Sequence, residues 1–180
     1  MIRIHIHVRT SVPLQRLPLE APVGAMPIRY LAYHEAGHAI AAAIYGVGFK
    51  YVTIRGRPGS RAHVYGLRKA GRTYSDWLKV LFAGQVAATI VAANDGMSPE
   101  DANRIGWSTA VHDQPAMDAA LSQSEWTELP PGWAEQATEE LAACWPLVEA
   151  VAERLLAHPR RLTRREVIDI IDAALPSVEE

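Results

Sequence analysis

The chain has 180 residues, of which 49% are hydrophobic and 21% charged, with 12 glycines and 12 prolines. This composition is typical of one globular domain and argues against a disordered, collagen-like or disulfide-rich chain. A formal net charge of -2 argues against nucleic acid as a partner, and the single cysteine, Cys144, suits a reducing cytoplasm.

The pattern of apolar residues argues against targeting segments. The opening residues, MIRIHIHVRTSVP, alternate charged and apolar side chains and lack the continuous apolar run of a secretory leader. The most apolar stretch, 80–93, contains Gln85 and is shorter than the roughly 18 residues that span a bilayer, so we expect a core helix there. The sequence predicts a cytoplasmic protein without a membrane partner and carries no signal for an oligomeric state.

The first half of the chain predicts one strand, two long helices and a hairpin between them. Residues 1–27 begin with IRIHIHV, whose alternation is typical of a half-buried strand, and continue as a proline-rich connector. A helix is expected from residue 28 to Gly46, since glycine readily takes the left-handed conformation that ends a helix. Two short apolar runs predict a hairpin over 51–65, and a second helix is expected over 74–93.

The second half predicts shorter helices. Ser98 and Pro99 are suited to be the N-cap and the first residue of one helix, and a second helix is expected to begin near Pro115. The intervening segment, 107–116, is expected to be irregular. Further helices are expected over 133–157 and 164–175.

Two local signals refine the last helices. Pro146 should kink or divide the first of them, because proline cannot donate the backbone hydrogen bond of a helix interior. Thr163 and Glu166 have the spacing of a capping box for the second. The chain is thus divided into a strand and connector (1–27), one main domain (28–175) and a tail (176–180).

The segment His34-Glu35-Ala36-Gly37-His38 forms an HExxH motif inside the first predicted helix. Residues four apart lie on one helix face, so both imidazoles can bind one zinc ion at about 2.0 to 2.1 Å. Glu35 lies about 100° round the helix, where it can act as general base on a zinc-activated water. An incidental trio without a metal would bury three polar groups at considerable cost. Gly37 indicates close approach of another backbone.

A catalytic zinc needs a third protein ligand and one open position. The chain lacks the glycine and histidine that the long metzincin motif requires at positions 41 and 44. It has no glutamate between Glu35 and Glu100, and its cysteine is far downstream. These absences leave an aspartate as the third ligand.

The chain offers several aspartates for that role, of which Asp76 and Asp101 are accounted for by their places at helix starts. Asp95 is accounted for by its Asp-Gly turn. Asp113 is the first choice because it lies in the expected irregular segment, although it could instead be an N-cap. Asp118 is the second choice, because it is expected to face the same region about one helical turn later.

Several segments resemble the peptidase domain of the FtsH family of ATP-dependent zinc metalloproteases. The segment AYHEAGHAIAA is similar to that family's AxHEAGHA signature, and FKYVTIRGRPG with AHVYG is similar to its hairpin. LFAGQVAATIV resembles its LxGGRAAEExxFG helix, and WPLVEAVAERLLAHPRRLTRREVIDII its closing helices. STAVHD stands where the family has a segment like TTGASND, so the resemblance also implies Asp113 as the third zinc ligand.

The chain also departs from that family. It contains no GxxxxGK[ST] phosphate loop, so no ATPase module or unfolding motor is expected. The family's acidic pair after GGRAA is replaced by Ala88 and Thr89, so Gln85 or Thr89 is expected to support a zinc histidine instead.

These observations predict a mainly α-helical, zincin-like metallopeptidase domain with a small β-hairpin and an N-terminal strand. The predicted function is a zinc-dependent endopeptidase, with Zn²⁺ held by His34, His38 and Asp113 and with Glu35 as catalytic base, acting on flexible or unfolded polypeptides. The alternative is a non-catalytic zinc-containing binding or regulatory module that acts with a partner ATPase or protease in trans. An intact Glu35 favours the enzyme, since a structural zinc site needs no base.

Overall fold

The computed structural model describes residues 26–55, 63–67, 73–124, 126, 128–157 and 161–174. The predicted N-terminal strand, almost all of the connector that follows it, and the tail 176–180 lie outside the described residues. The division of the chain at residues 27 and 175 therefore stays a prediction.

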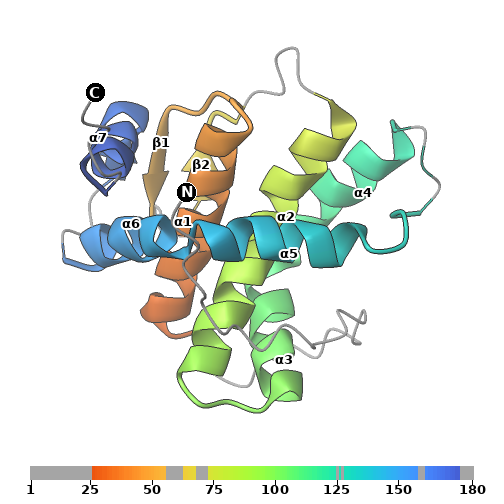
Figure 1. Ribbon diagram of the computed structural model, residues 1–180, viewed down its shortest axis with the longest axis horizontal. Helices are drawn as coiled ribbons and strands as arrows, with labels where there is room; N and C mark the ends of the chain where they lie inside the picture. The colour runs from red at the N-terminus through yellow and green to blue at the C-terminus, as the bar shows by residue number, and fades with distance from the viewer. Residues whose placement is uncertain are drawn as a thin grey trace, which may run out of the picture.

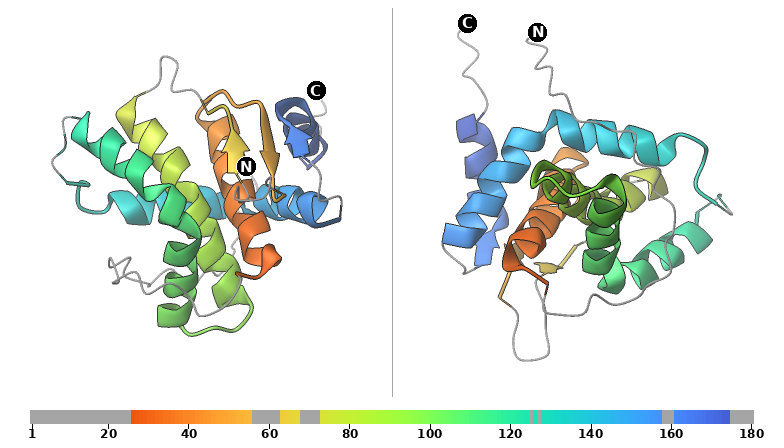
Figure 2. Two further views of the ribbon diagram at one scale, coloured as in Figure 1. Left: turned by 180° about the vertical axis from the view of Figure 1, so that it is seen from behind. Right: turned by 90° about the horizontal axis from the view of Figure 1, so that it is seen from below.

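The described residues are mainly α-helical, with one small antiparallel sheet. In chain order the elements are α1 (Ile28–Ile44), β1 (Tyr51–Thr53), β2 (His63–Tyr65), α2 (Tyr74–Asn94), α3 (Pro99–Thr109), the 3-10 helix η1 (Ala110–His112), α4 (Gln114–Ser122), α5 (Trp133–Ala143), α6 (Trp145–Ala157), β3 (Arg161–Thr163) and α7 (Arg164–Ala174). Figure 1 shows α1 and α2 at the centre, with α5 and α6 running across one face and with the sheet and α7 at one end. Seen from behind, α3 and α4 lie over α2 on the opposite face (Figure 2).

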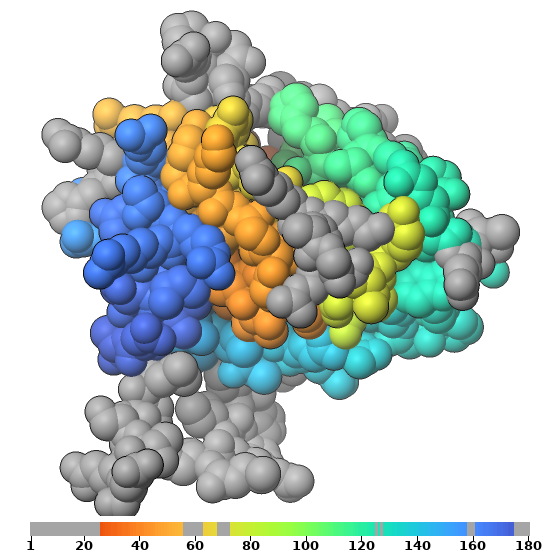
Figure 3. All heavy atoms as spheres, turned by 90° about the horizontal axis from the view of Figure 1, so that it is seen from above, coloured from red at the N-terminus to blue at the C-terminus, as the bar shows by residue number. Residues whose placement is uncertain are grey.

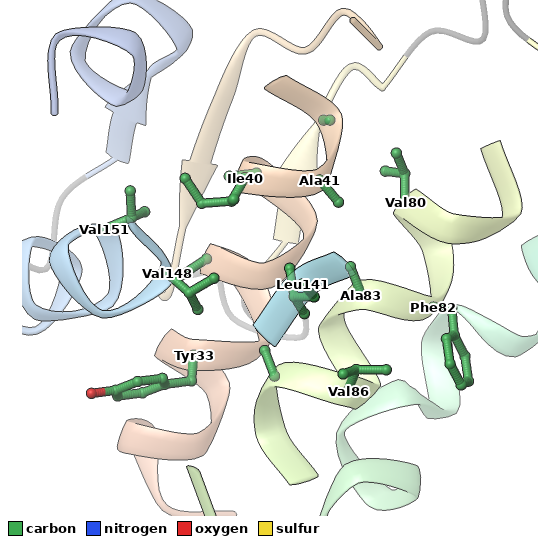
Figure 4. Close-up of a cluster of buried hydrophobic side chains, with 14 of the residues drawn as sticks. Tyr33, Ile40, Ala41, Val80, Phe82, Ala83, Val86, Leu141, Val148 and Val151 are labelled. Carbon is green, nitrogen blue, oxygen red and sulfur yellow. The ribbon is translucent and has the colours of Figure 1, made fainter. Parts of the chain in front are cut away.

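Helices α1 and α2 form the centre of the hydrophobic core. Both are buried on nearly all sides, which explains why neither is strongly amphipathic. Their side chains meet those of α5 and α6 in the cluster drawn in Figure 4, where Ile40 of α1 and Val148 of α6 are fully buried. A Cβ at Gly37 would lie 2.5 Å from the backbone oxygen of Ala83, so the predicted close approach at this glycine is confirmed. This contact fixes α1 against α2.

Helix α2 is both long and strongly apolar. With 21 residues it is long and apolar enough to cross a membrane, and 78% of its most apolar 18-residue window is buried inside the protein. Burial of this extent is usual for the core helix of a globular domain. The helix, Tyr74–Asn94, begins six residues before the apolar stretch 80–93, and this added length is why it reaches the span of a membrane.

The sheet has the order β2-β1-β3, with both neighbours antiparallel to β1. Val52 of β1 is in register with Val64 and Leu162, and these residues turn one face toward the core. The predicted hairpin strands are confirmed as β1 and β2, whereas the turn between them lies outside the described residues. Strand β3 is not among the predicted elements, because three residues ahead of a helix carry too little alternation to indicate a strand.

Helix boundaries follow the predicted caps. Ser98 accepts a hydrogen bond from the amide of Asp101, and Pro99 is the first residue of α3. The Thr163 and Glu166 side chains each accept a hydrogen bond from the other residue's amide, so the capping box of α7 is confirmed. The long predicted helix 133–157 is divided into α5 and α6, with Pro146 as the second residue of α6.

The prediction that residues 107–116 are irregular is wrong. Helix α3 continues to Thr109, η1 follows directly, and α4 begins at Gln114. The β-branched and polar residues here have low helix propensity, but buried packing of Thr109 and Ala110 outweighs it. The Ser108 and Thr109 hydroxyls donate to the backbone oxygens of Arg104 and Gly106, which satisfies part of the helix end.

Candidate metal centre

The two histidines of the HExxH motif lie one turn apart on α1 and point the same way. His34 and His38 are each only 3% exposed. Their rings meet edge to face, with centroids 4.6 Å apart, and their Nε2 atoms are separated by 3.0 Å. The spacing of the motif therefore brings two ring nitrogens to one point, as predicted.

Asp113 completes this group from a distant part of the chain. Its Oδ2 lies 2.9 Å from His34 Nε2 and 3.3 Å from His38 Nε2. Asp113 occupies the N-cap position of α4, but its side chain makes no capping hydrogen bond. The carboxylate thus faces the histidines rather than the helix end.

The other two candidate aspartates lie elsewhere. Asp118 accepts a hydrogen bond from Gln114 on the exposed side of α4, so the expectation that it faces the same region is wrong. Asp95 ends α2 and forms an ion pair with Arg29. Among the described residues, only the group of His34, His38 and Asp113 has the spacing of a metal site.

The hydrogen bonds behind the rings determine which lone pairs face the centre. Nδ1 of His38 lies 2.7 Å from the backbone oxygen of Val80, which can only accept, so Nδ1 carries the proton. Nδ1 of His34 lies 2.9 Å from the Thr109 hydroxyl, whose own hydrogen is donated to the backbone oxygen of Gly106. His34 is therefore also protonated at Nδ1. Both neutral rings then direct the lone pair of Nε2 at the same point.

Two lone pairs and a carboxylate this close require a positive charge between or upon them. Tetrahedral zinc with ligands at about 2.0 to 2.1 Å holds neighbouring ligand atoms about 3.3 Å apart. The three measured separations, 2.9, 3.0 and 3.3 Å, fit one ion in contact with all three atoms. The group could thus hold a metal ion, and its two nitrogens and one oxygen are donors that suit zinc.

The residues that orient the histidines differ from those expected. Thr109 and the Val80 carbonyl take this role, so the expectation that Gln85 or Thr89 would do so is wrong. The polar side-chain atoms of Gln85 and the hydroxyl of Thr89 are buried without a hydrogen-bond partner in the described part of the chain. The only signal for Thr109 in the sequence is its position four residues before Asp113.

Gly84 of α2 gives the rings their space. A Cβ at this position would lie 2.4 Å from His38 Nε2 and 2.7 Å from His34 Cε1. Both distances are shorter than any ordinary contact, so a side chain here would displace the imidazoles. The role of Gly84 cannot be predicted from the sequence, because a glycine within an apolar helix does not indicate which side chains it faces.

Glu35 lies beside the metal-binding group in a cavity of about 230 Å³. The cavity is lined by residues of α1, by His63 and Val64 of β2, and by the segment around Asp113. Glu35 is 3% exposed, and its Oε2 atom has no hydrogen-bond partner among the described residues. A buried carboxylate oxygen without a partner is costly, and it is available to a ligand that enters the cavity.

The charges of the group are strongly coupled. Burial lowers the pKa of His38, but the Asp113 carboxylate outweighs burial and raises it to about 9. Burial and the charge of His38 lower the pKa of His34. Burial raises the pKa of Asp113, but the positive charge of the nearby His38 outweighs burial and holds it well below the usual range. Without a metal, one proton on His38 thus provides the positive charge.

Burial also raises the pKa of Glu35 to about 8, with opposing effects from the charge of His38 and a hydrogen bond from the Val64 amide. Glu35 is then mostly protonated at neutral pH while no metal is bound. A divalent cation nearby favours the ionised form of Glu35, so this carboxylate would be able to accept a proton at neutral pH only with metal present.

Comparison with known proteins adds no relative: no family model and no curated protein matches this chain. The resemblance to the FtsH peptidase domain therefore stays a prediction from the sequence motifs. The site itself is defined by geometry, as a buried group of two histidines and one aspartate able to hold a metal ion beside a buried glutamate.

Proposed function

We propose that this protein is a zinc-dependent endopeptidase with a zincin-like domain. The observation that carries the proposal is the convergence of two imidazole lone pairs and the Asp113 carboxylate in a cavity that also contains Glu35. Three protein ligands leave a tetrahedral ion one open position, which is the usual arrangement of a catalytic rather than a structural zinc site.

Each group has a separate task in this proposal. His34, His38 and Asp113 would hold Zn²⁺, which when bound polarises a carbonyl and activates water for attack. Glu35 accepts a proton during the attack and donates it to the leaving amine. Thr109 and the Val80 carbonyl hold both rings in the tautomer that leaves Nε2 free for the metal.

The substrates we propose are flexible or unfolded polypeptides, without an ATPase of the chain's own to unfold them. The cavity lies against β2, which among the described strands pairs with β1 on one side only. An extended chain could pair with the other side of β2 and pass through a cavity of this size, whereas a folded domain could not. Folded substrates would need a partner ATPase.

Substitution of Glu35 by Gln tests the mechanism. Cleavage of casein or of a quenched fluorescent peptide should be abolished by the variant and by a chelator, while the variant should bind zinc as the wild type does. If the wild type binds zinc but cleaves neither substrate, the alternative of a non-catalytic zinc module is favoured. Equal cleavage by wild type and variant would contradict the mechanism.

A further inference from the structure

The outer face of the sheet carries a cluster of aromatic rings. Tyr51 and Tyr65, which are paired across β1 and β2, stack with ring centroids 5.0 Å apart and planes 16° from parallel. The ring of His63 lies 6.0 Å from that of Tyr51 and 6.1 Å from that of Tyr65. Tyr65 is 48% exposed. We refer to Tyr51, His63 and Tyr65 as the aromatic face.

Two cations border the aromatic face. The Lys50 ammonium lies 5.8 Å from the centre of the Tyr65 ring, and the Arg161 guanidinium lies 5.4 Å from that of Tyr51. Both residues are exposed. Hydrogen bonds from the Thr163 amide and hydroxyl, with smaller effects of Arg154 and Arg161, lower the pKa of the nearby Glu166. Among the described residues, neither Lys50 nor Arg161 forms an ion pair, so both positive charges are available to an anionic partner.

The aromatic face is continuous with the candidate metal centre. His63 belongs to the aromatic face and also lines the cavity that contains His34 and Glu35. Tyr65 follows two residues later on the same strand, about 7 Å further along. In the view from above, the orange segment that includes β1 lies between α7 and α2 (Figure 3).

A peptide that pairs with the side of β2 opposite β1, where no described strand lies, would place every second side chain on this face of the sheet. Side chains directly opposite on neighbouring strands approach to about 4.5 to 5.5 Å between Cβ atoms, close enough for aromatic and charged pairs. Such a peptide would bring its alternate side chains next to His63 and Tyr65 while its backbone passes the cavity.

We propose that the aromatic face is a substrate subsite that selects extended peptides with aromatic and acidic side chains at alternate positions. This proposal rests on the proposed peptidase function and narrows its substrate class. An aromatic side chain stacks on Tyr65, and a carboxylate pairs with Lys50, whose ammonium lies over the same ring. Single-stranded nucleic acid also uses rings and cations, but a net charge of -2 and only two bordering cations favour a peptide.

Peptide binding to the zinc-loaded Glu35→Gln protein tests the proposal without requiring hydrolysis. The probes are two fluorescein-labelled decapeptides, measured by fluorescence anisotropy. In one, every second residue is Asp or Phe, so that both kinds of side chain share one face of the extended chain, and the other has Lys and Ser in their place. We expect about tenfold tighter binding of the first peptide. Tyr65→Ser should remove most of this preference, and Lys50→Ala should remove the part of the preference that comes from the acidic side chains. Ile44→Ala, at an equally exposed site on α1, should leave the preference unchanged.

Equal binding of both peptides, or a preference that survives Tyr65→Ser, would overturn the proposal. Displacement of the peptide by a short oligothymidine at lower concentration than by unlabelled peptide would also overturn it, in favour of a nucleic acid partner. A clear preference with no hydrolysis by the wild type would retain the subsite and refute the peptidase. Hydrolysis with no preference would do the reverse.

Discussion

Substitution of Gly84 by alanine tests the metal centre at its most constrained point. The added Cβ would lie 2.4 Å from His38 Nε2 and 2.7 Å from His34 Cε1, whereas ordinary contacts begin at 3.4 Å. Both rings therefore have to shift by about 0.7 to 1 Å. The alternative is that α2 moves away from α1. This movement is unfavourable because it would open the closely packed contact between the two helices at Gly37.

The expected effects on stability and on metal binding differ in size. Alanine favours the helix over glycine by about 1 kcal/mol, while overpacking costs about 1 to 3 kcal/mol. The free energy of unfolding of the metal-free protein should thus fall by about 2 kcal/mol at most. Metal ligands tolerate displacements of only about 0.2 Å, so we expect zinc affinity to fall by about 100-fold, or about 2.8 kcal/mol.

The assay is competition for zinc between the protein and a chromophoric chelator, with circular dichroism to verify folding. Gly48→Ala is the matched control, because a Cβ at Gly48 meets no atom within 4 Å. The control should bind zinc as the wild type does. A folded Gly84→Ala variant with wild-type zinc affinity would refute the proposed position of the metal between the two rings.

Three further outcomes are expected. Thr109→Val removes the group that orients His34 and should weaken zinc binding by about 10- to 100-fold in the same competition assay, with secondary structure unchanged; unchanged affinity would contradict the role of Thr109. Because the pKa of His38 is raised to about 9 by Asp113 and that of Glu35 to about 8 by burial, zinc displaces up to two protons, so affinity should rise by up to about 100-fold per pH unit below pH 8, by up to about tenfold between pH 8 and 9, and then level off. Titration in weak buffer should detect the released proton, and an affinity independent of pH would be inconsistent with this coupling. Gly37→Ala forces the backbones of α1 and α2 apart; an overpacking cost of about 1 to 3 kcal/mol, less the helix gain of about 1 kcal/mol, should lower the free energy of unfolding by up to about 2 kcal/mol in urea, and a raised midpoint would contradict this.

Local signals account for the parts of the fold that the sequence predicts well. The caps at Ser98 and Thr163 and the break near Pro146 each depend on neighbouring residues, and the structure confirms them. The HExxH spacing likewise places His34 and His38 together, because the geometry of one helix turn is fixed. Such features need no knowledge of the tertiary structure.

The remaining parts depend on contacts between distant segments. Strand β3 has only three residues and exists through its pairing with β1, about a hundred positions earlier in the chain. Thr109 and Gly84 matter because of the rings they face, which no local pattern reveals. Elimination identifies Asp113 in a segment that the sequence predicts to be irregular, yet Asp113 occupies a turn between helical elements that burial stabilises.

The zinc content of the purified chain tests the central claim most directly. Metal analysis after loading with zinc and dialysis should find about one zinc ion per wild-type chain and a large loss in the Asp113→Ala variant. Absence of zinc from the folded wild type, or equal zinc content in both proteins, would contradict a metal centre formed by His34, His38 and Asp113.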